Sequence, residues 1–212
     1  MSQHERDICQ ISEVQPYLFL SGCKGLNSDS LSRLGIKRVI NASLEVPLIE
    51  SESIESIRIP VNDVPGKNHI IIHFDPVAEM IDTSVKNQEG VLVHCVAGVS
   101  RSATLVLAYL MKHRGMRLRD AFLFLHSKRH VIRPNFSFFE QLIAYEKTLF
   151  GETTVEMVNI SLIDGSLLTV PNLYQEKQFR RKILLEVIVK KRLKRVQPTS
   201  NEPTNQTTPQ FT

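Results

Sequence analysis

Residues 91–111 read Val-Leu-Val-His-Cys-Val-Ala-Gly-Val-Ser-Arg-Ser-Ala-Thr-Leu-Val-Leu-Ala-Tyr-Leu-Met, and this stretch decides the fold. Val91–Val93 follows Gly90 and is wholly apolar, which is typical of a strand buried on both faces of a parallel sheet. Residues 102–113 have the composition of a helix. The sequence therefore predicts a strand, a tight loop over residues 94–101 and a helix, which together form the building unit of an α/β protein.

The rest of the chain repeats this alternation. Runs rich in apolar and β-branched residues predict further strands, and polar starts followed by apolar periodicity predict helices. The predicted strands cover residues 17–20, 36–42 and 54–61, and the predicted helices lie just before Gly35 and over 75–86, 119–127 and 136–150. Asp75 is the expected N-cap of its helix, with Pro76 at the first helical position, and Asn135 and Gly151 are expected to cap the last helix. The predicted fold is an α/β sandwich with a central, mostly parallel sheet flanked by helices.

The loop after the buried strand carries the residues of a nucleophilic anion site. Cys95 stands at the carboxyl end of the strand, where open α/β sheets place their ligands. Backbone N–H groups of a tight loop, the helix N-terminus and the Arg101 guanidinium all favour a bound anion, and they also favour the thiolate. Gly98 permits a backbone path that a Cβ atom would obstruct. Ser102 is placed to hydrogen-bond the sulfur, so the residues predict phosphoryl transfer through a phosphocysteine.

The alternative for Cys95 is an inert cysteine buried at a strand end, which is a common situation. The combination of Cys, Gly, Arg and Ser at these spacings between a strand and a helix favours the functional interpretation.

The net charge of +4 is distributed unevenly. Residues 177–195 hold nine basic residues and one glutamate, a net charge of +8, and the tail 196–212 holds one acid. Residues 1–176 therefore carry a net charge of −3. We expect a flexible N-terminus over 1–9, a catalytic domain with a short extension over 10–176, a basic amphipathic segment over 177–195 and a disordered tail over 196–212.

The cysteines and the hydropathy narrow the class of protein. Three cysteines at wide spacing do not suggest a disulfide framework, so a reducing compartment, cytoplasmic or nuclear, is expected, with Cys9 and Cys23 as inert side chains. The sequence has neither an apolar run long enough to span a bilayer nor a secretory leader at its start. No histidine ligand set and no phosphate-binding GxxxxGK[ST] motif occur, so neither a metal nor another cofactor is expected.

The segment HCVAGVSRS at residues 94–102 resembles the HCxxGxxRS signature of the protein tyrosine phosphatase superfamily. The runs YLFLSG, INAS, VND, FDPVAEMI, VIRPNFSFFEQLIAYEKTLFG and TVEMV extend the similarity over about residues 10–176 to the small atypical dual-specificity phosphatases. This resemblance implies the same α/β fold and a protein phosphatase that hydrolyses phosphotyrosine and phosphoserine or phosphothreonine without a metal.

The resemblance also implies roles for individual residues. Cys95 corresponds to the nucleophile, Arg101 to the phosphoryl-binding residue, and the loop Val96, Ala97, Gly98, Val99, Ser100 and Arg101 to the phosphate cradle. His94 is expected to hold the loop and tune the thiolate. Asp63 corresponds to the general acid, with a solvated turn residue as the alternative. Asp75 is a weaker candidate because helix capping explains it.

Two further features bear on the loop and its substrate. Arg133 and Asn135 match a family segment that supports the loop, although helix capping alone also explains Asn135. Val96, Ala97 and Val99 include no basic residue, which favours phosphoproteins over phosphoinositides or RNA 5′-triphosphates as substrates. Kinases are one class of such substrates, although the chain reaches the catalytic domain too early to hold a kinase-docking domain ahead of it.

The basic segment 177–195 allows three interpretations. It could pack on the domain as an amphipathic helix, act as a nuclear-import patch through residues 190–195, or bind anionic membrane. Two alternative functions for the whole chain are a non-catalytic phosphopeptide-binding module and a nucleic-acid binder. An intact Cys95, Arg101 and Asp63 argue against the first, and a domain of net charge −3 argues against the second.

Overall fold

The computed structural model describes residues 9–64, 66, 69–161 and 165–175. The basic segment 177–195, the tail 196–212 and residues 1–8 lie outside the described residues, so the expectations for them stay predictions. The strands are β1 (Ser12–Gln15), β2 (Leu18–Gly22), β3 (Ile36–Asn41), β4 (Glu55–Arg58), β5 (Gly90–Cys95), β6 (Met157–Ser161) and β7 (Leu167–Pro171). The α-helices are α2 (Ser28–Arg33), α3 (Phe74–Lys86), α4 (Arg101–Arg114), α5 (Leu118–Lys128) and α6 (Phe136–Phe150), and 3₁₀ turns occur at Cys23–Gly25, Ile70–His73 and Asn172–Gln175.

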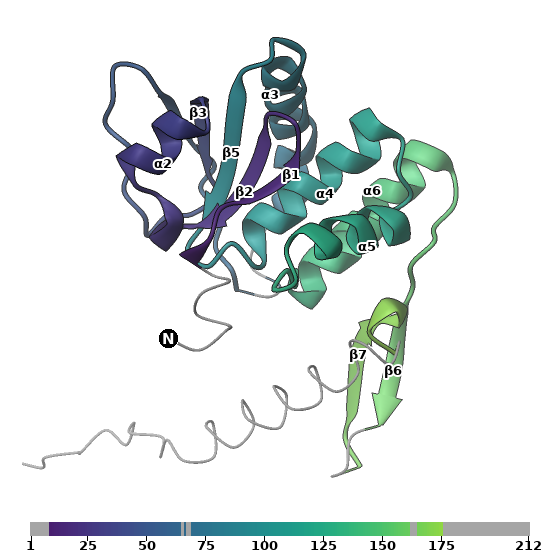
Figure 1. The fold of residues 1–212 in the computed structure, drawn as a ribbon. Coiled ribbons are helices and arrows are strands. Elements are labelled where there is room, and N and C mark those ends of the chain that lie inside the picture. The colour runs from purple at the N-terminus through teal and green to yellow at the C-terminus, as the bar shows by residue number, and fades with distance from the viewer. Residues whose placement is uncertain (1–8, 65, 67–68, 162–164, 176–212) are drawn as a thin grey trace, which may run out of the picture.

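A five-stranded sheet forms the centre of the molecule (Figure 1). Its strand order is β1-β2-β5-β3-β4; β2, β5, β3 and β4 run parallel, and β1 is an antiparallel edge strand. The four parallel strands confirm the predicted mostly parallel sheet. All six residues of β5 are buried, as a central strand covered on both faces requires.

Two layers of helices cover the two faces of the sheet (Figure 1). Alternate residues along each strand point to opposite faces. On β5, Leu92 packs with Leu31 of the short helix α2, whereas Val91 and Val93 belong to the larger core beneath α3, α4, α5 and α6. Helix α4 is buried from Arg101 to Met111, so it is the central helix of that larger layer. Only residues 96–100 separate the end of β5 from the start of α4, so the two lie close together.

Helix α3 begins differently from the prediction. It starts at Phe74, after the 3₁₀ turn Ile70–His73, so Asp75 is inside the first turn and is not the N-cap. The Asp75 carboxylate instead accepts hydrogen bonds from Lys112 Nζ (2.6 Å) and from the Tyr145 hydroxyl (2.7 Å). These partners on α4 and α6 lower the pKa of Asp75, and Lys112 has the larger effect. They account for an aspartate at this position better than helix capping does. The strand predicted over 54–61 is also shorter and covers Glu55–Arg58.

The caps predicted for α6 are confirmed. The Asn135 side chain accepts from the backbone N–H of Phe138 (3.0 Å), and Gly151 ends the helix in a left-handed conformation, with φ 81°. Beyond it, β6 and β7 form an antiparallel hairpin that returns to the helical layer, where the Tyr174 ring contacts Phe122 and Phe139. None of the helices in the described part of the chain has the length and apolar character needed to cross a membrane.

Candidate active site

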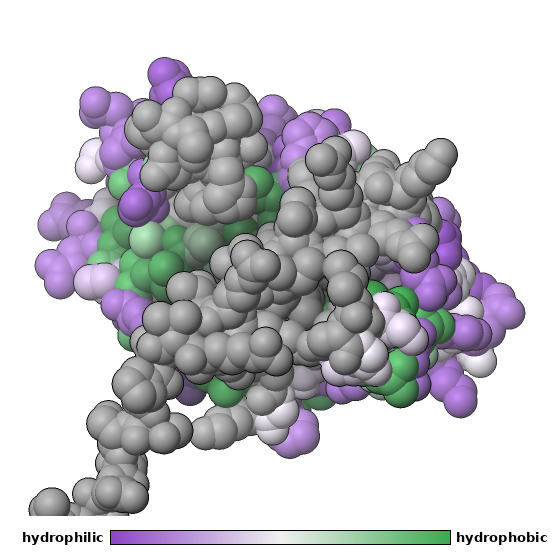
Figure 2. Space-filling view, turned by 90° about the horizontal axis from the view of Figure 1, so that it is seen from below, coloured by the Kyte–Doolittle hydropathy of each residue, from purple (hydrophilic) through white to green (hydrophobic). Residues whose placement is uncertain are grey.

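The carboxyl ends of three neighbouring parallel strands meet at one edge of the sheet. The connections that leave β3, β4 and β5 there carry Glu45, Asp63 and Cys95. Figure 2 views the molecule from below and shows a larger hydrophobic area on the left and a smaller one on the right of the atoms drawn in grey. Four side chains of the same connections, Leu44, Leu48, Val64 and Val96, are between 39% and 48% exposed. The connections that carry the polar site residues therefore also expose apolar side chains.

The loop after β5 wraps around the Cys95 sulfur. The Gly98 backbone N–H and the Ser102 hydroxyl each donate a hydrogen bond to Sγ, at 3.2 Å. Gly98 has φ +66°, and a Cβ atom there would lie 2.3 Å from the backbone carbon of Ser21 on β2. Only glycine fits this close approach of two backbones, and the approach turns the Gly98 N–H toward the sulfur.

Arg101 lies in the first turn of α4 with its side chain only 4% exposed. Its Nη1 donates to the Glu45 carboxylate, at 2.8 Å to Oε2 and 3.1 Å to Oε1, and to the backbone oxygen of Val61 at 3.0 Å. Its Nε is buried and has no hydrogen-bond partner among the described residues. One end of the guanidinium is thus held by the protein, while the Nε edge keeps an unused donor in the site.

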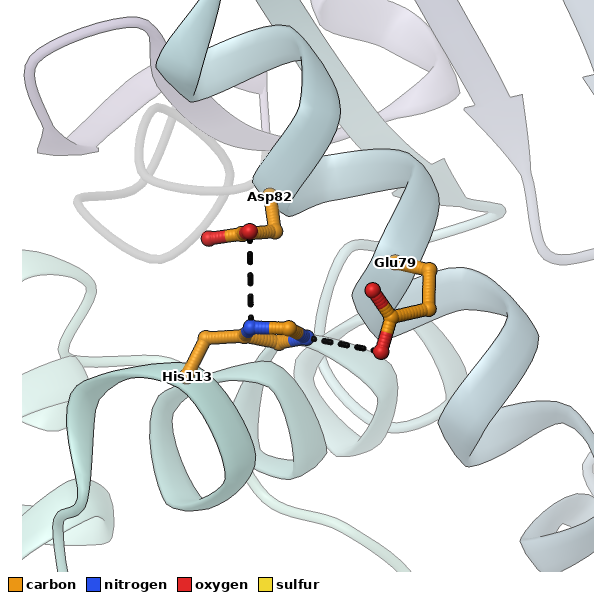
Figure 3. Close-up of side chains that lie close together, drawn as sticks. All are labelled: Glu79, Asp82 and His113. Atoms are coloured by element: carbon orange, nitrogen blue, oxygen red, sulfur yellow. Dashed lines mark ion pairs between the residues drawn. The ribbon is translucent and has the colours of Figure 1, made fainter.

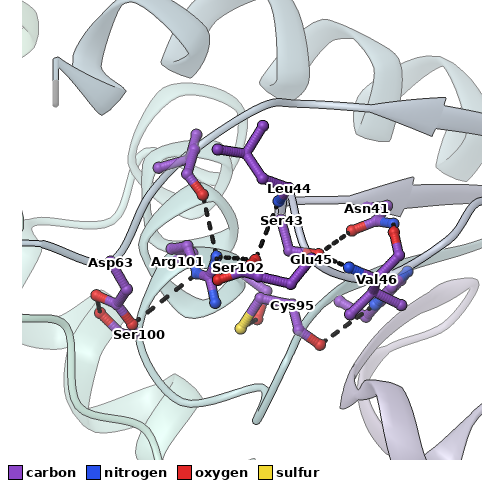
Figure 4. A network of polar contacts seen from close by, with 12 residues as sticks. Asn41, Ser43, Leu44, Glu45, Val46, Asp63, Cys95, Ser100, Arg101 and Ser102 are labelled. Carbon is purple, nitrogen blue, oxygen red and sulfur yellow. Dashed lines mark hydrogen bonds and ion pairs between the residues drawn. The ribbon is translucent and has the colours of Figure 1, made fainter.

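Asp63 is attached to the same loop through one oxygen. Its Oδ1 accepts hydrogen bonds from the Ser100 hydroxyl and from Asn135 Nδ2, both at 2.8 Å. Its Oδ2 lies 3.9 Å from Arg101 Nε, as Figure 4 shows from close by. The structure therefore brings Asp63, Arg101, Ser102 and Cys95 together. It does not bring Asp75 there, since Lys112 on the far end of α4 holds that residue.

His94 is buried behind the loop, with 1% of its surface exposed. Its Nδ1 lies 3.3 Å from the backbone oxygen of Cys95. Burial lowers the pKa of His94 from 6.5 to about 4, so the ring is neutral near neutral pH. A neutral, enclosed imidazole fits the expected role of holding the loop rather than transferring protons.

Comparison with known proteins agrees with this geometry. Residues 18–148 match the family described as dual specificity phosphatase, catalytic domain. The chain belongs to the dual-specificity phosphatase family. It is 42% identical over 177 residues to human dual specificity protein phosphatase 21, covering 83% of this chain and 90% of that protein, and 42% identical over 155 residues to human dual specificity protein phosphatase 14, covering 73% and 78%. The crystal structure of human DUSP28 has a TM-score of 0.63 and 34% identity and covers 66% of this chain and 94% of its own.

Membership establishes a dual-specificity protein phosphatase of the metal-independent, cysteine-based kind. The fold and the protein family predicted from the signature loop are thereby confirmed.

Arg129 of this phosphatase was missed by the sequence analysis. It follows α5 and is only 3% exposed. Its Nε donates to the backbone oxygen of Gly98 at 2.8 Å, and its Nη2 donates to that of Ala97 at 3.2 Å. Because Arg129 holds these carbonyl groups on the outer side of the loop, it favours the arrangement in which the loop N–H groups face inward. No local pattern distinguishes this arginine from its basic neighbours Lys128 and His130.

Glu45 was the second omission. It is exposed and shares its connection with Glu50 and Glu52, so its sequence context gives no reason to select it over them. The hydrogen bond from Arg101 lowers the pKa of Glu45, so the carboxylate stays ionised near neutral pH.

An acid–histidine cluster lies on α3 and α4 of the phosphatase. Glu79, Asp82 and His113 have ligand atoms within 4.8 Å of one another (Figure 3). Glu79 faces the Nε2 atom of His113 at 3.2 Å, whereas Asp82 faces Nδ1 at 3.5 Å. The two carboxylates therefore lie beside different nitrogens of the ring. Lys112 and Lys86 also pair with these acids, at 3.0 and 2.6 Å, so the cluster is an ion-pair network that joins α3 to α4.

Proposed function

We propose that Cys95 is the nucleophile of this phosphatase, with Arg101 and the loop 96–101 as its phosphoryl-binding groups, Asp63 as general acid and Ser102 as the donor that stabilises the departing thiolate. The supporting observation is the cluster itself. Sγ accepts from Gly98 and Ser102, while Arg101 Nε has no hydrogen-bond partner among the described residues and lies 3.9 Å from Asp63 Oδ2.

The two steps follow from these groups. Cys95 Sγ attacks phosphorus, the ester P–O bond breaks, and Asp63 gives its proton to the departing oxygen. A water then attacks the phosphocysteine, its proton passes to Asp63, and the P–S bond breaks to release inorganic phosphate and the thiolate. Arg101 and the loop N–H groups stabilise the charge of the equatorial oxygens in both steps. His94, Arg129 and Asn135 position the groups that react.

Phosphoproteins are the substrates of such an enzyme, and we propose kinases as one class among them. The apolar side chains around the site, Leu44, Leu48, Val64 and Val96, suit contact with a folded or extended polypeptide. For the basic segment 177–195 we keep the proposal of an import patch or an anionic-membrane contact. Cys9, Cys23 and Cys95 are all free thiols, which is consistent with a cytoplasmic or nuclear location.

The direct test uses the purified chain. It should hydrolyse aryl phosphate in EDTA, vanadate should inhibit it, and Cys95→Ser should reduce turnover to background. Asp63→Ala should slow turnover of phosphopeptides by about 10²–10⁴. Turnover that survives Cys95→Ser would assign the nucleophile elsewhere. The doubly substituted Asp63→Ala, Cys95→Ser chain can then be used to capture phosphoproteins from cells, with and without residues 177–212.

A further inference from the structure

The connection that leaves β3 is held in one shape by buried polar side chains. Asn41 and Ser43 are both fully buried. Asn41 Nδ2 donates to the backbone oxygen of Val46 at 2.8 Å, and the Ser43 hydroxyl donates to Asn41 Oδ1 at 2.6 Å. From β4, Arg58 Nη1 donates to the backbone oxygen of Ser43 at 2.7 Å. A loop fixed at this many points holds the residues between Ser43 and Val46 in a defined direction.

One of these residues is Glu45. Its carboxylate bridges Arg101 Nη1 with both oxygens, and Oε2 also accepts from the backbone N–H of Leu44 at 3.0 Å. Figure 4 shows Glu45 and Asp63 approaching the guanidinium from opposite sides. The Glu45 carboxylate is therefore held in position to contact Arg101, because the backbone N–H of Leu44 fixes one of its oxygens.

The contacts of Arg101 with the protein use only some of its hydrogen-bond donors. A guanidinium has five N–H groups, of which Nη1 carries two. Glu45 and the Val61 backbone oxygen take both of those. The Nε donor, buried and unpartnered, stays on the edge that can form a two-pronged contact with a phosphoryl group.

We propose that Glu45 is the positioning residue of Arg101: it neutralises the buried guanidinium in the free enzyme and fixes its rotation so that the Nε edge faces the phosphoryl group. The proposal rests on the assignment of Arg101 as the phosphoryl-binding residue. It adds that the connection after β3, and not the phosphate loop, sets the orientation of that arginine. Glu45 is 54% exposed, so the loop that carries it is accessible to a phosphoprotein that enters the site.

The test is a double-mutant cycle on the full chain with aryl phosphate as substrate and vanadate as the phosphoryl analogue. Glu45→Ala should lower kcat/KM and vanadate affinity by about tenfold in the wild-type background, the size of one charge-assisted hydrogen bond. In an Arg101→Ala background the same change should cost less than about twofold, because the group it positions is gone. Glu45→Gln, which keeps an acceptor for Nη1, should recover part of the loss.

Glu52→Ala is the matched control, an exposed glutamate further along the same connection, and it should leave both constants unchanged. Equal losses from Glu45→Ala in both backgrounds, or no loss in the wild type, would overturn the proposal. Unchanged thermal unfolding of each variant shows that the fold is retained. A wild-type chain without turnover would instead overturn the assignment of the site, so the two failures are distinguishable.

Discussion

At the scale of single residues, Asp63, which we propose as the general acid, is held through only one of its two carboxylate oxygens. Ser100 and Asn135 donate to one oxygen, and the other oxygen faces the site near Arg101. The free oxygen is the one that can carry a proton toward a leaving group. Asn135 has a second task, because its side-chain oxygen caps α6 while its amide nitrogen reaches Asp63.

Serine at position 135 separates these two tasks. Asn135→Ser keeps a good helix cap and removes the Nδ2 donor to Asp63. We expect kcat for phosphopeptides, whose alkoxide leaving groups need a proton, to fall by about three- to tenfold, the value of one neutral hydrogen bond. Turnover of an aryl phosphate with an acidic phenol should hardly change, and neither should the melting temperature. An equal loss on both substrates would mean that Asn135 supports the loop rather than the acid.

At the scale of elements, the site depends on two backbones in contact. Strand β2 runs beside β5, with Gly22 opposite Cys95, and the Cys23 N–H donates to the backbone oxygen of Val96 at 3.0 Å. The phosphate loop therefore turns against the end of β2, and Gly98 is the point of closest approach. The shape of the anion cradle is a property of this strand pair as much as of the loop itself.

Gly98→Ala tests that dependence. Its Cβ would lie 2.3–2.5 Å from three backbone atoms of Ser21 and Gly22, so the loop must move away and kcat/KM should fall about a hundredfold or more. Gly115→Ala is the control, because Gly115 has nearly the same φ, +64°, at the end of α4, with nothing within 4 Å of the added carbon. It should cost about 1–2 kcal/mol of stability and no activity. Full activity in Gly98→Ala would show that the loop tolerates displacement from β2.

At the scale of the whole molecule, burying a histidine links stability to pH. The folded-state pKa of His94 is about 4, below its ordinary value of 6.5, because burial disfavours the charged ring. Below pH 6.5 the His94 ring is protonated in the unfolded chain but stays neutral in the folded chain, so the free energy of unfolding falls as the pH falls from 6.5 toward 4. His73 shifts in the same direction through burial. Glu45, Asp75 and Glu79 have lowered pKa values and lose their contribution only at more acidic pH.

Urea unfolding measures this link. The free energy of unfolding should be about 2 kcal/mol lower at pH 5 than at pH 7.5, most of it from His94. His94→Asn should flatten the pH dependence even if it lowers stability overall. Replacing the exposed His69 with Gln should leave it unchanged. A His94 variant with the full wild-type dependence would assign the effect to other groups.

The sequence by itself determined the parts of this phosphatase that lie close together along the chain. The buried strand, the loop that follows it and the helix that begins at Arg101 are consecutive, so Cys95, Gly98, Arg101 and Ser102 could be named from spacing and residue type. The caps of α6 were equally local. Asp75 was misjudged because its actual partners, Lys112 and Tyr145, stand 37 and 70 residues away.

Only the tertiary structure decided which distant residues complete the site. Glu45 meets Arg101 across 56 residues, Arg129 meets Gly98 across 31, and Asn135 meets Asp63 across 72. The strand order β2-β5-β3-β4 brings the strand ends that precede Glu45, Asp63 and the phosphate loop to one edge, and the packing of α5 and α6 brings Arg129 and Asn135 to the same place. Local residue preferences fix the conformation of a loop or helix, whereas the packing of the sheet and its helices fixes which charged side chains face one another across it.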